Sequence, residues 1–199
     1  LADCNALIAR AGVEQVDWVG TSMGGLIGMM LAAQPGSPLG RLVINDVGPF
    51  IPKEALERIA SYVGQSPAFA ELDELERYMR VINAPFGELS DEQWRHLAVH
   101  NARQTDSGQW IYAYDPGIRE IFSQSAIDDI NLWPVWDGVC NPTLLLRGAD
   151  SDVLRREDAQ AMTRRGPKPE LVEFTGVGHA PVLMNDEQIA VVRNWLLAA

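Results

Sequence analysis

The sequence has few cysteines and no long hydrophobic segment. Its two cysteines, Cys4 and Cys140, form no C-x-x-C pair, so a disulfide framework is not indicated. No run of residues is long and apolar enough to span a bilayer. The first residues also lack the basic region and apolar core of a secretory signal. We therefore expect a cytoplasmic protein that does not insert into a membrane.

Positive charge is also scarce. The chain has 16 Lys and Arg against 27 Asp and Glu, which gives a formal net charge of -11. Such a surface repels phosphate backbones and anionic lipids, so we expect neither nucleic acid nor a membrane as a partner. The 199 residues, 47% of them hydrophobic, suit a soluble globular domain with room for an inserted subdomain. The expected partner is a small-molecule substrate, and the oligomeric state stays open.

Strand and helix patterns alternate in the first and last parts of the chain. Short apolar runs predict buried strands at residues 16–19, 42–44, 143–146 and 171–174. Helices are expected at residues 2–11, 26–33 and 155–165, and at the C-terminal end with Ile189, Val192, Trp195 and Leu196 on its apolar face. Strands that alternate with helices predict an α/β fold with a mostly parallel sheet flanked by helices.

The middle of the chain has a helical pattern instead. Apolar residues recur at helical spacing over residues 72–82, and residues 90–93 form a capping box. A turn is expected at residues 115–117. We therefore expect an α/β core from residues 1–48 and 137–199, with residues 49–136 as an inserted helical domain.

The most informative motif is G-x-S-x-G at residues 20–24, between an expected strand and an expected helix. Gly20 and Gly24 lack a Cβ, which lets the chain turn sharply and leaves Ser22 strained and exposed. At the start of the helix, the amide of Met23 could stabilise an oxyanion. The context predicts a nucleophile elbow with Ser22 as nucleophile. The alternative is an ordinary strand-to-helix turn with a serine cap.

A serine nucleophile needs an imidazole to accept its proton, and a carboxylate to orient that imidazole. Of the three histidines, His179 lies in a glycine-rich loop directly after the last expected strand. A loop in that place can project its side chain over the end of a strand, so His179 is the expected base. A surface loop histidine is the alternative.

Two strand ends offer a carboxylate. Asp152 follows the strand at residues 143–146, with Asp150 beside it and better suited to hydrogen bonding in the turn. Asp46 follows the strand at residues 42–44. Catalytic groups in α/β sheets gather at the carboxyl ends of strands, so both places are suitable. The chain order Ser, Asp, His leads us to prefer Asp152 as the acid, with Asp46 as the alternative.

His96 and His100 lie four residues apart on an expected helix, a spacing that can hold a metal. No Glu completes an H-E-x-x-H pattern, and we interpret the pair as part of a solvated polar face. No P-loop and no G-x-G-x-x-G motif is present. We expect no metal and no organic cofactor.

Three segments in this order resemble the α/β-hydrolase superfamily, in particular its bacterial members with a helical cap. They are residues 20–25, 144–152 and 176–181. The resemblance implies a serine hydrolase with Ser22 as nucleophile, His179 as base and Asp152 as acid. Asp46 matches an alternative acid position that some members use. The resemblance also implies that residues 49–136 form the cap.

One feature departs from that family, in which the elbow follows the fifth strand of the sheet. Here the elbow begins at residue 20, so the earlier strands and the loop that supplies a second oxyanion donor are missing. The edge of the expected sheet would be unpaired and apolar. We therefore expect an N-terminally truncated sequence, whose 199 residues alone are inactive or poorly folded.

The expected reaction is attack by Ser22 on a small, partly apolar carboxylic ester, thioester or lactone, through an acyl-enzyme. The large apolar side chains of residues 49–136 favour such a substrate over a sugar or nucleotide. A C–C bond hydrolase and a cofactor-free peroxidase or dioxygenase are alternatives on the same scaffold, because a fold alone does not define a function. A non-catalytic ligand-binding protein is the remaining alternative.

Overall fold

A computed structural model describes residues 1–65, 67–123 and 126–198, which form two compact units. Unit 1 comprises Leu1–Ile51 and Asp129–Ala199, and unit 2 comprises Pro52–Asp128. The expected domains, 1–48 with 137–199 and 49–136, have somewhat different boundaries and include residues 66, 124, 125 and 199, which lie outside the described residues. That unit 2 acts as a cap stays a prediction.

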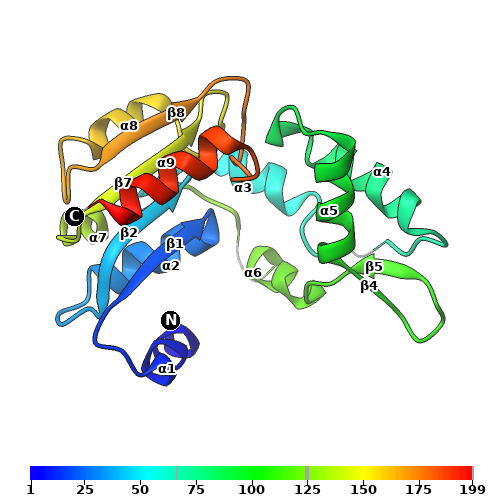
Figure 1. The fold of residues 1–199 in the computed structure, drawn as a ribbon, viewed down its shortest axis with the longest axis horizontal. Coiled ribbons are helices and arrows are strands. Elements are labelled where there is room, and N and C mark those ends of the chain that lie inside the picture. Colours follow the sequence, from blue (N-terminus) through cyan, green and yellow to red (C-terminus); the bar gives the residue numbers. More distant parts are fainter. Residues whose placement is uncertain (66, 124–125, 199) are drawn as a thin grey trace. The chain divides into compact units, whose positions relative to one another are not determined.

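Unit 1 is built on a four-stranded sheet in the order β1-β2-β7-β8, with every pair parallel (Figure 1). Its elements are α1 (Ala2–Ala11), β1 (Val16–Thr21), α2 (Met23–Ala32), β2 (Leu39–Asn45), β3 (Phe50–Ile51), β6 (Ile130–Asn131), α7 (Trp133–Asp137), β7 (Thr143–Gly148), α8 (Arg156–Met162), β8 (Glu170–Phe174) and α9 (Asp186–Leu197). The predicted α/β class, with a parallel sheet flanked by helices, is confirmed. Parallel pairing brings the carboxyl ends of all four strands to the same edge.

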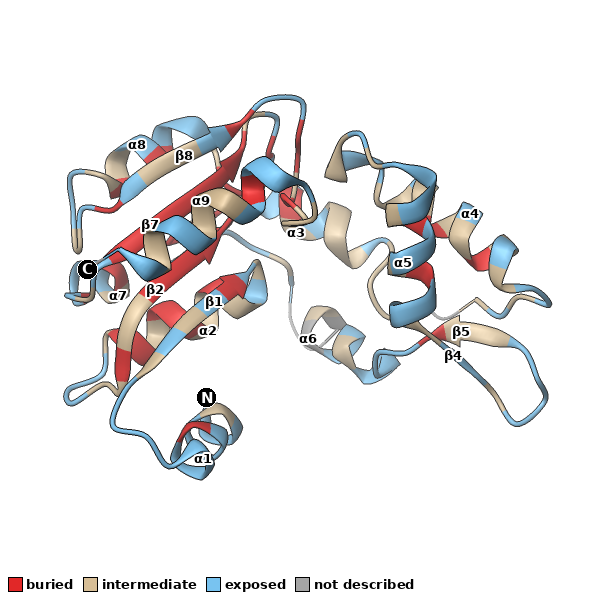
Figure 2. Ribbon diagram, in the orientation of Figure 1, coloured by how far each residue is buried: buried red, intermediate tan, exposed pale blue. Residues whose placement is uncertain are grey.

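Helices α2 and α9 cover opposite faces of this sheet. Val43 of β2 lies in an apolar cluster against which Trp195 of α9 packs. Leu42, the preceding residue, points to the other face, where a Cβ on Gly28 of α2 would come within 2.9 Å of its side chain. Successive side chains of a strand alternate between faces, so β2 needs apolar residues throughout. The central strands β2 and β7 are accordingly the most buried part of the sheet (Figure 2).

The apolar face of α9 differs from the expected one at one position. Ile189 is 45% exposed, whereas Gln188 is buried. The Gln188 side chain turns inward because its Oε1 accepts a hydrogen bond from the Leu183 amide at 2.8 Å. The helix therefore packs against the sheet through Val191 and Trp195, on the same side as Gln188.

The part of the chain that belongs to unit 1 also differs from expectation. Strands β3 and β6 pair in antiparallel fashion, and the Leu132 amide donates to the Pro49 carbonyl at 2.6 Å. This short ladder keeps α7 with the core, where Trp136 is fully buried. Trp133 and Trp136 therefore belong to unit 1 rather than to the inserted domain.

Unit 2 contains α3 (Lys53–Ala60), α4 (Leu72–Ile82), η1 (Ala84–Phe86), α5 (Asp91–Asn101), β4 (Ala102–Gln104), β5 (Trp110–Tyr112), η2 (Pro116–Arg119) and α6 (Glu120–Ser123). Helix α4 has the bounds that the spacing predicted. Its Leu75 and Met79 pack with Ala98 of α5 and Tyr112 of β5 in one cluster. The hairpin β4–β5 corrects the all-helical expectation, because Trp110 to Tyr112 are strong strand formers.

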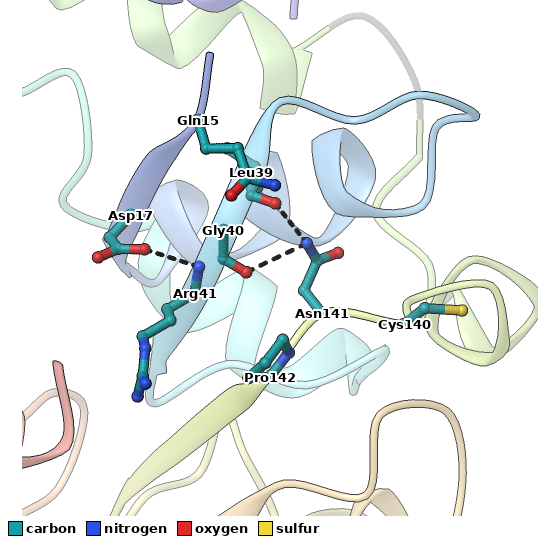
Figure 3. A pocket seen from close by; sticks show the side chains of 8 residues that line it. All are labelled: Gln15, Asp17, Leu39, Gly40, Arg41, Cys140, Asn141 and Pro142. Carbon is teal, nitrogen blue, oxygen red and sulfur yellow. Dashed lines mark hydrogen bonds between the residues drawn. The ribbon is translucent and has the colours of Figure 1, made fainter. Parts of the chain in front are cut away.

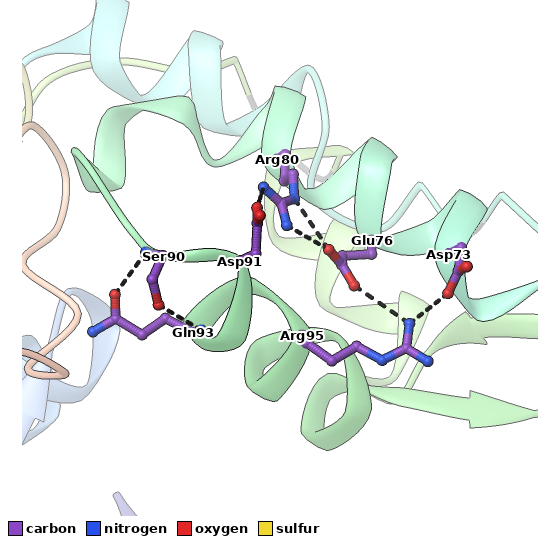
Figure 4. Close-up of polar contacts among 7 residues, drawn as sticks. All are labelled: Asp73, Glu76, Arg80, Ser90, Asp91, Gln93 and Arg95. Atoms are coloured by element: carbon purple, nitrogen blue, oxygen red, sulfur yellow. Dashed lines mark hydrogen bonds and ion pairs between the residues drawn. The ribbon is translucent and has the colours of Figure 1, made fainter.

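Polar contacts join α4 to α5 on the surface of unit 2 (Figure 4). The Arg80 guanidinium binds Glu76 at 2.7 Å and Asp91 at 2.8 Å, and these hydrogen bonds raise the pKa of Arg80. The predicted capping box of α5 is present, with the Gln93 amide 3.2 Å from Ser90 Oγ. Among the residues described in either unit, no helix combines the length and apolarity needed to cross a membrane.

Candidate active site

Ser22 lies in a sharp turn between β1 and α2. Strand β1 ends at Thr21, α2 begins at Met23, and Ser22 itself has a φ of 51°. A non-glycine residue at positive φ is strained by about 1–3 kcal/mol. Hydrogen bonds hold it there: its amide donates to the Asn45 carbonyl at 2.9 Å, and its carbonyl accepts from the Gly25 amide at 2.8 Å. The Ser22 hydroxyl is thereby presented at the carboxyl edge of the sheet.

The glycines of this turn are not equivalent. A Cβ on Gly20 would lie 2.2 Å from the Gly24 carbonyl oxygen, and one on Gly25 would lie 2.6 Å from Val47. A Cβ on Gly24 would meet nothing within 4 Å. The tight turn therefore depends on Gly20 and Gly25. The expected steric role of Gly24 is corrected, because its Cα faces open space.

His179 connects Ser22 to a carboxylate through both of its ring nitrogens. Its Nε2 is 2.9 Å from Ser22 Oγ, and its Nδ1 is 2.8 Å from Asp46 Oδ2. The His179 side chain is 10% exposed and the Asp46 side chain is fully buried. The arrangement can remove the hydroxyl proton at Nε2 while the carboxylate orients the ring at Nδ1.

Backbone and side-chain hydrogen bonds fix the position of Asp46. It follows β2 with a φ of 57°, and its amide donates to the Leu146 carbonyl at 2.9 Å. Its second carboxylate oxygen, Oδ1, accepts from the Gly148 amide at 2.8 Å. Each carboxylate oxygen therefore has its own partner, and the side chain has one direction.

The carboxylate that faces His179 is Asp46, the alternative, and not the preferred Asp152. Both ring nitrogens of His179 are already engaged, by Ser22 and Asp46, and Asp152 is exposed. The sequence could not separate the two carboxylates because both follow neighbouring parallel strands. The positive φ of Asp46 turns its side chain toward the ring, and the sequence does not reveal that angle.

The segment after β7 supports the His179 loop. The Asp150 amide donates to the Val177 carbonyl at 2.9 Å, so Asp150 acts through its backbone. A Cβ on Gly148 would lie 2.2 Å from the Gly178 carbonyl oxygen, so only glycine lets the loop pass this closely. Sequence reasoning missed Gly148, although its place at the end of a buried strand was a usable signal.

The remaining expectations concern the oxyanion donor, a metal site and the two other histidines. Met23, the first residue of α2, has one of the amides that an α-helix leaves without an intrahelical partner. Among residues 1–65, 67–123 and 126–198, no group of three or more metal-binding side chains is found. His96 and His100 are exposed on α5 with their ring centroids 4.2 Å apart, and they belong to unit 2.

The unequal glycines give a direct prediction. We expect Gly20→Ala to destabilise the protein by more than about 3 kcal/mol, because the new Cβ meets rigid backbone. We expect Gly24→Ala to be neutral or stabilising by up to about 1 kcal/mol, because alanine favours a helix. Urea denaturation of both variants measures the free energy of unfolding. Equal destabilisation by the two substitutions would contradict the geometry.

Comparison with known proteins agrees with this architecture. A family model described as "Alpha/beta hydrolase family" matches residues 1–192. A 3-hydroxybutyrate-oligomer hydrolase of Cupriavidus necator is 41% identical over 207 residues, covering 100% of this chain and 71% of that protein. An esterase of Mycobacterium tuberculosis is 30% identical over 74% of this chain and 48% of its own length.

Solved structures give the same result. A protein from Rickettsia typhi matches with a TM-score of 0.90 and 31% identity, over 98% of this chain and 66% of that one. An α/β hydrolase from Novosphingobium aromaticivorans matches with a TM-score of 0.85 and 35% identity, over 98% and 69%. The chain thus spans about two thirds of the length of these structures. With its parallel sheet, its elbow and these matches, the chain belongs to the α/β hydrolase family.

Proposed function

We propose that the protein is a serine hydrolase that cleaves small carboxylic esters through an acyl-enzyme. One observation carries the proposal: Ser22, His179 and Asp46 form a continuous hydrogen-bonded chain, with links of 2.9 Å and 2.8 Å. A hydroxyl, an imidazole and a buried carboxylate in this order activate a nucleophile near neutral pH.

In the proposed acylation step, Ser22 Oγ attacks the carbonyl carbon of the ester while its proton passes to His179 Nε2. Asp46 stabilises the resulting imidazolium through Nδ1. The carbonyl oxygen becomes an oxyanion, toward which the Met23 amide at the start of α2 is the proposed donor. When the oxyanion collapses, the C–O bond to the alkoxide breaks, and the alkoxide takes the proton from Nε2 and leaves as the alcohol.

In the proposed deacylation step, a water molecule takes the place of the alcohol. His179 Nε2 removes one proton from the water as its oxygen attacks the acyl carbon. Collapse of this second oxyanion breaks the bond to Ser22 Oγ and returns the proton to it. The carboxylic acid leaves, and the side chains regain their starting state without any cofactor.

The relatives support a substrate class for this reaction. The Cupriavidus necator relative, 41% identical over the whole chain, is named for hydrolysis of 3-hydroxybutyrate oligomers, and the mycobacterial relative is named an esterase. An oligomer of a short hydroxy acid is a small, partly apolar ester. We therefore propose hydroxyalkanoate ester oligomers as the substrate class. Hydrolysis of a C–C bond, peroxidase activity and ligand binding without turnover are the competing outcomes.

The nucleophile is tested by Ser22→Ala in the protein at its full coding length. We expect turnover of a short-chain nitrophenyl ester to fall by about 10⁴-fold or more, because no acyl-enzyme can form. We also expect the variant to lose covalent labelling by a serine-directed phosphonate, read by intact-mass spectrometry. Retained labelling would show that another serine reacts.

The acid is tested by comparing Asp46→Asn with Asp152→Asn. The Gly148 amide is a donor, so it would keep the side-chain oxygen of the new asparagine facing it. The side-chain nitrogen of the asparagine would then face His179 Nδ1. The ring would then carry its proton on Nε2 and could not accept one from Ser22. We expect kcat to fall by about 10⁴-fold for Asp46→Asn. We expect less than about a twofold change for the exposed Asp152. The opposite order would return the role to Asp152.

The substrate class is tested with 3-hydroxybutyrate dimer and trimer, using chromatography to follow the release of monomer. We expect Ser22-dependent hydrolysis of both oligomers and none of the corresponding amides, because an alkoxide leaves more readily than an amine anion. Turnover of nitrophenyl esters without cleavage of the oligomers would retain the hydrolase but reject this substrate class.

A further inference from the structure

Asn45 connects the nucleophile segment to the base loop. It is the last residue of β2 and is fully buried. Its side-chain Nδ2 donates to Thr21 Oγ1 at 3.0 Å and to the Pro181 carbonyl oxygen at 2.7 Å. Thr21 directly precedes Ser22, and Pro181 lies two residues after His179. A single amide group therefore ties together the two segments that must meet for proton transfer.

The backbone of Asn45 makes further contacts within the same site. Its carbonyl oxygen accepts the hydrogen bond from the Ser22 amide at 2.9 Å. The next residue, Asp46, holds the other side of the His179 ring. Asn45 therefore contacts Ser22, directly precedes Asp46 and binds the loop that carries His179.

The chemistry of these contacts requires an amide. The Pro181 carbonyl can only accept, so the nitrogen of the Asn45 side chain has to face it, and this fixes the orientation of the amide. An aspartate of the same shape would offer no donor to the carbonyl, and a leucine would offer none to either partner. The two partners together use both amide hydrogens.

The other atom of this amide serves no comparable purpose. Asn45 Oδ1 is buried and has no hydrogen-bond partner among the residues that the structure describes. A buried acceptor without a protein partner is unfavourable for stability. The favourable contacts of the asparagine side chain are therefore the two hydrogen bonds that Nδ2 donates, to Thr21 and to the loop of His179.

We infer that Asn45 is a positioning residue, which holds the His179 loop where Nε2 meets Ser22 Oγ. This inference rests on the proposed serine-hydrolase function. Without the amide, the loop would keep its support from the Asp150 amide and Gly148 but lose its direct link to the nucleophile strand. The ring would then spend less time within bonding distance of the hydroxyl.

The test compares wild type with Asn45→Leu in the protein at its full coding length. We expect kcat to fall by about 10²-fold, since small misplacements of a catalytic group have effects of that size. We expect KM to change little, because Asn45 holds the base rather than the substrate. The rate of phosphonate labelling, which also needs His179, should fall in parallel with kcat.

Asn141 provides the matched control. Its Nδ2 also donates to two oxygen atoms of unit 1, the carbonyls of Leu39 at 2.6 Å and Gly40 at 3.3 Å. These lie at the amino ends of β2 and β7, the opposite edge of the sheet from Ser22 (Figure 3). We expect Asn141→Leu to lower the urea midpoint while kcat stays within about twofold of wild type.

Thr21→Val serves as the second variant if Asn45→Leu does not fold. It removes only the Oγ1 acceptor and leaves the bond to Pro181, so we expect a smaller fall in kcat at nearly unchanged stability. A folded Asn45→Leu with wild-type kcat would overturn the inference, as would wild-type kcat in Thr21→Val when Asn45→Leu is unfolded. A wild-type protein that neither hydrolyses esters nor reacts with the phosphonate would instead overturn the proposed function, and the inference with it.

Discussion

Parallel pairing of β1, β2, β7 and β8 is the constraint on which the rest of the site depends. Each strand ends at the same edge, and each end contributes one group: Ser22 after β1, Asp46 after β2, Gly148 at the end of β7 and His179 after β8. The register pairs Thr21 with Asn45 and Asn45 with Leu146. A slip of two residues would move a strand end by about 7 Å, far more than a hydrogen bond of 2.9 Å tolerates.

Two strained residues convert this alignment into directed side chains. Ser22 and Asp46 both have a positive φ, 51° and 57°, and each follows directly on a strand. Each also continues the hydrogen bonding of the sheet by one residue, because the amides of Ser22 and Asp46 donate to the carbonyls of Asn45 and Leu146, respectively. Strain of about 1–3 kcal/mol at each position is tolerated because the surrounding strands over-determine the backbone. The buried C-terminal half of β2 and the fully buried β7 therefore support the directions of the Ser22 and Asp46 side chains.

The segment after β7 has a supporting function that differs from its apparent chemical one. The Arg147 side chain is almost fully buried, and its Nε donates to the Leu154 carbonyl at 2.8 Å. Its Nη1 binds the Glu173 carboxylate on β8 at 2.6 Å. A buried guanidinium that binds both the loop and the next strand fixes the path of residues 148–154, which in turn holds the loop of His179. A segment that looks like a source of a catalytic carboxylate thus acts here as a support for the loop of His179.

Local sequence patterns predicted most of the elements of unit 1 and pointed to two of the side chains that the structure brings together, Ser22 and His179. Alternation of apolar runs with helical segments indicated the parallel sheet, and the elbow and the glycine-rich loop made Ser22 and His179 the candidates for nucleophile and base. The same information could not choose between Asp46 and Asp152, because the two carboxylates are chemically alike and follow neighbouring strands. Nor could it foresee that Ile189 faces solvent, because a hydrogen bond from Leu183 to Gln188 sets the roll of α9.

Only the tertiary structure decided how groups far apart in the chain meet. Asn45 and Pro181 are 136 residues apart, and the bond between them depends on strand order, register and one amide orientation. The steric demand on Gly20 and its absence at Gly24 likewise depend on how closely other backbone approaches. Periodicity and motifs report what a residue prefers within its own segment. Side-chain direction and close approach are set by neighbours from other segments, and these become neighbours only when the sheet has formed.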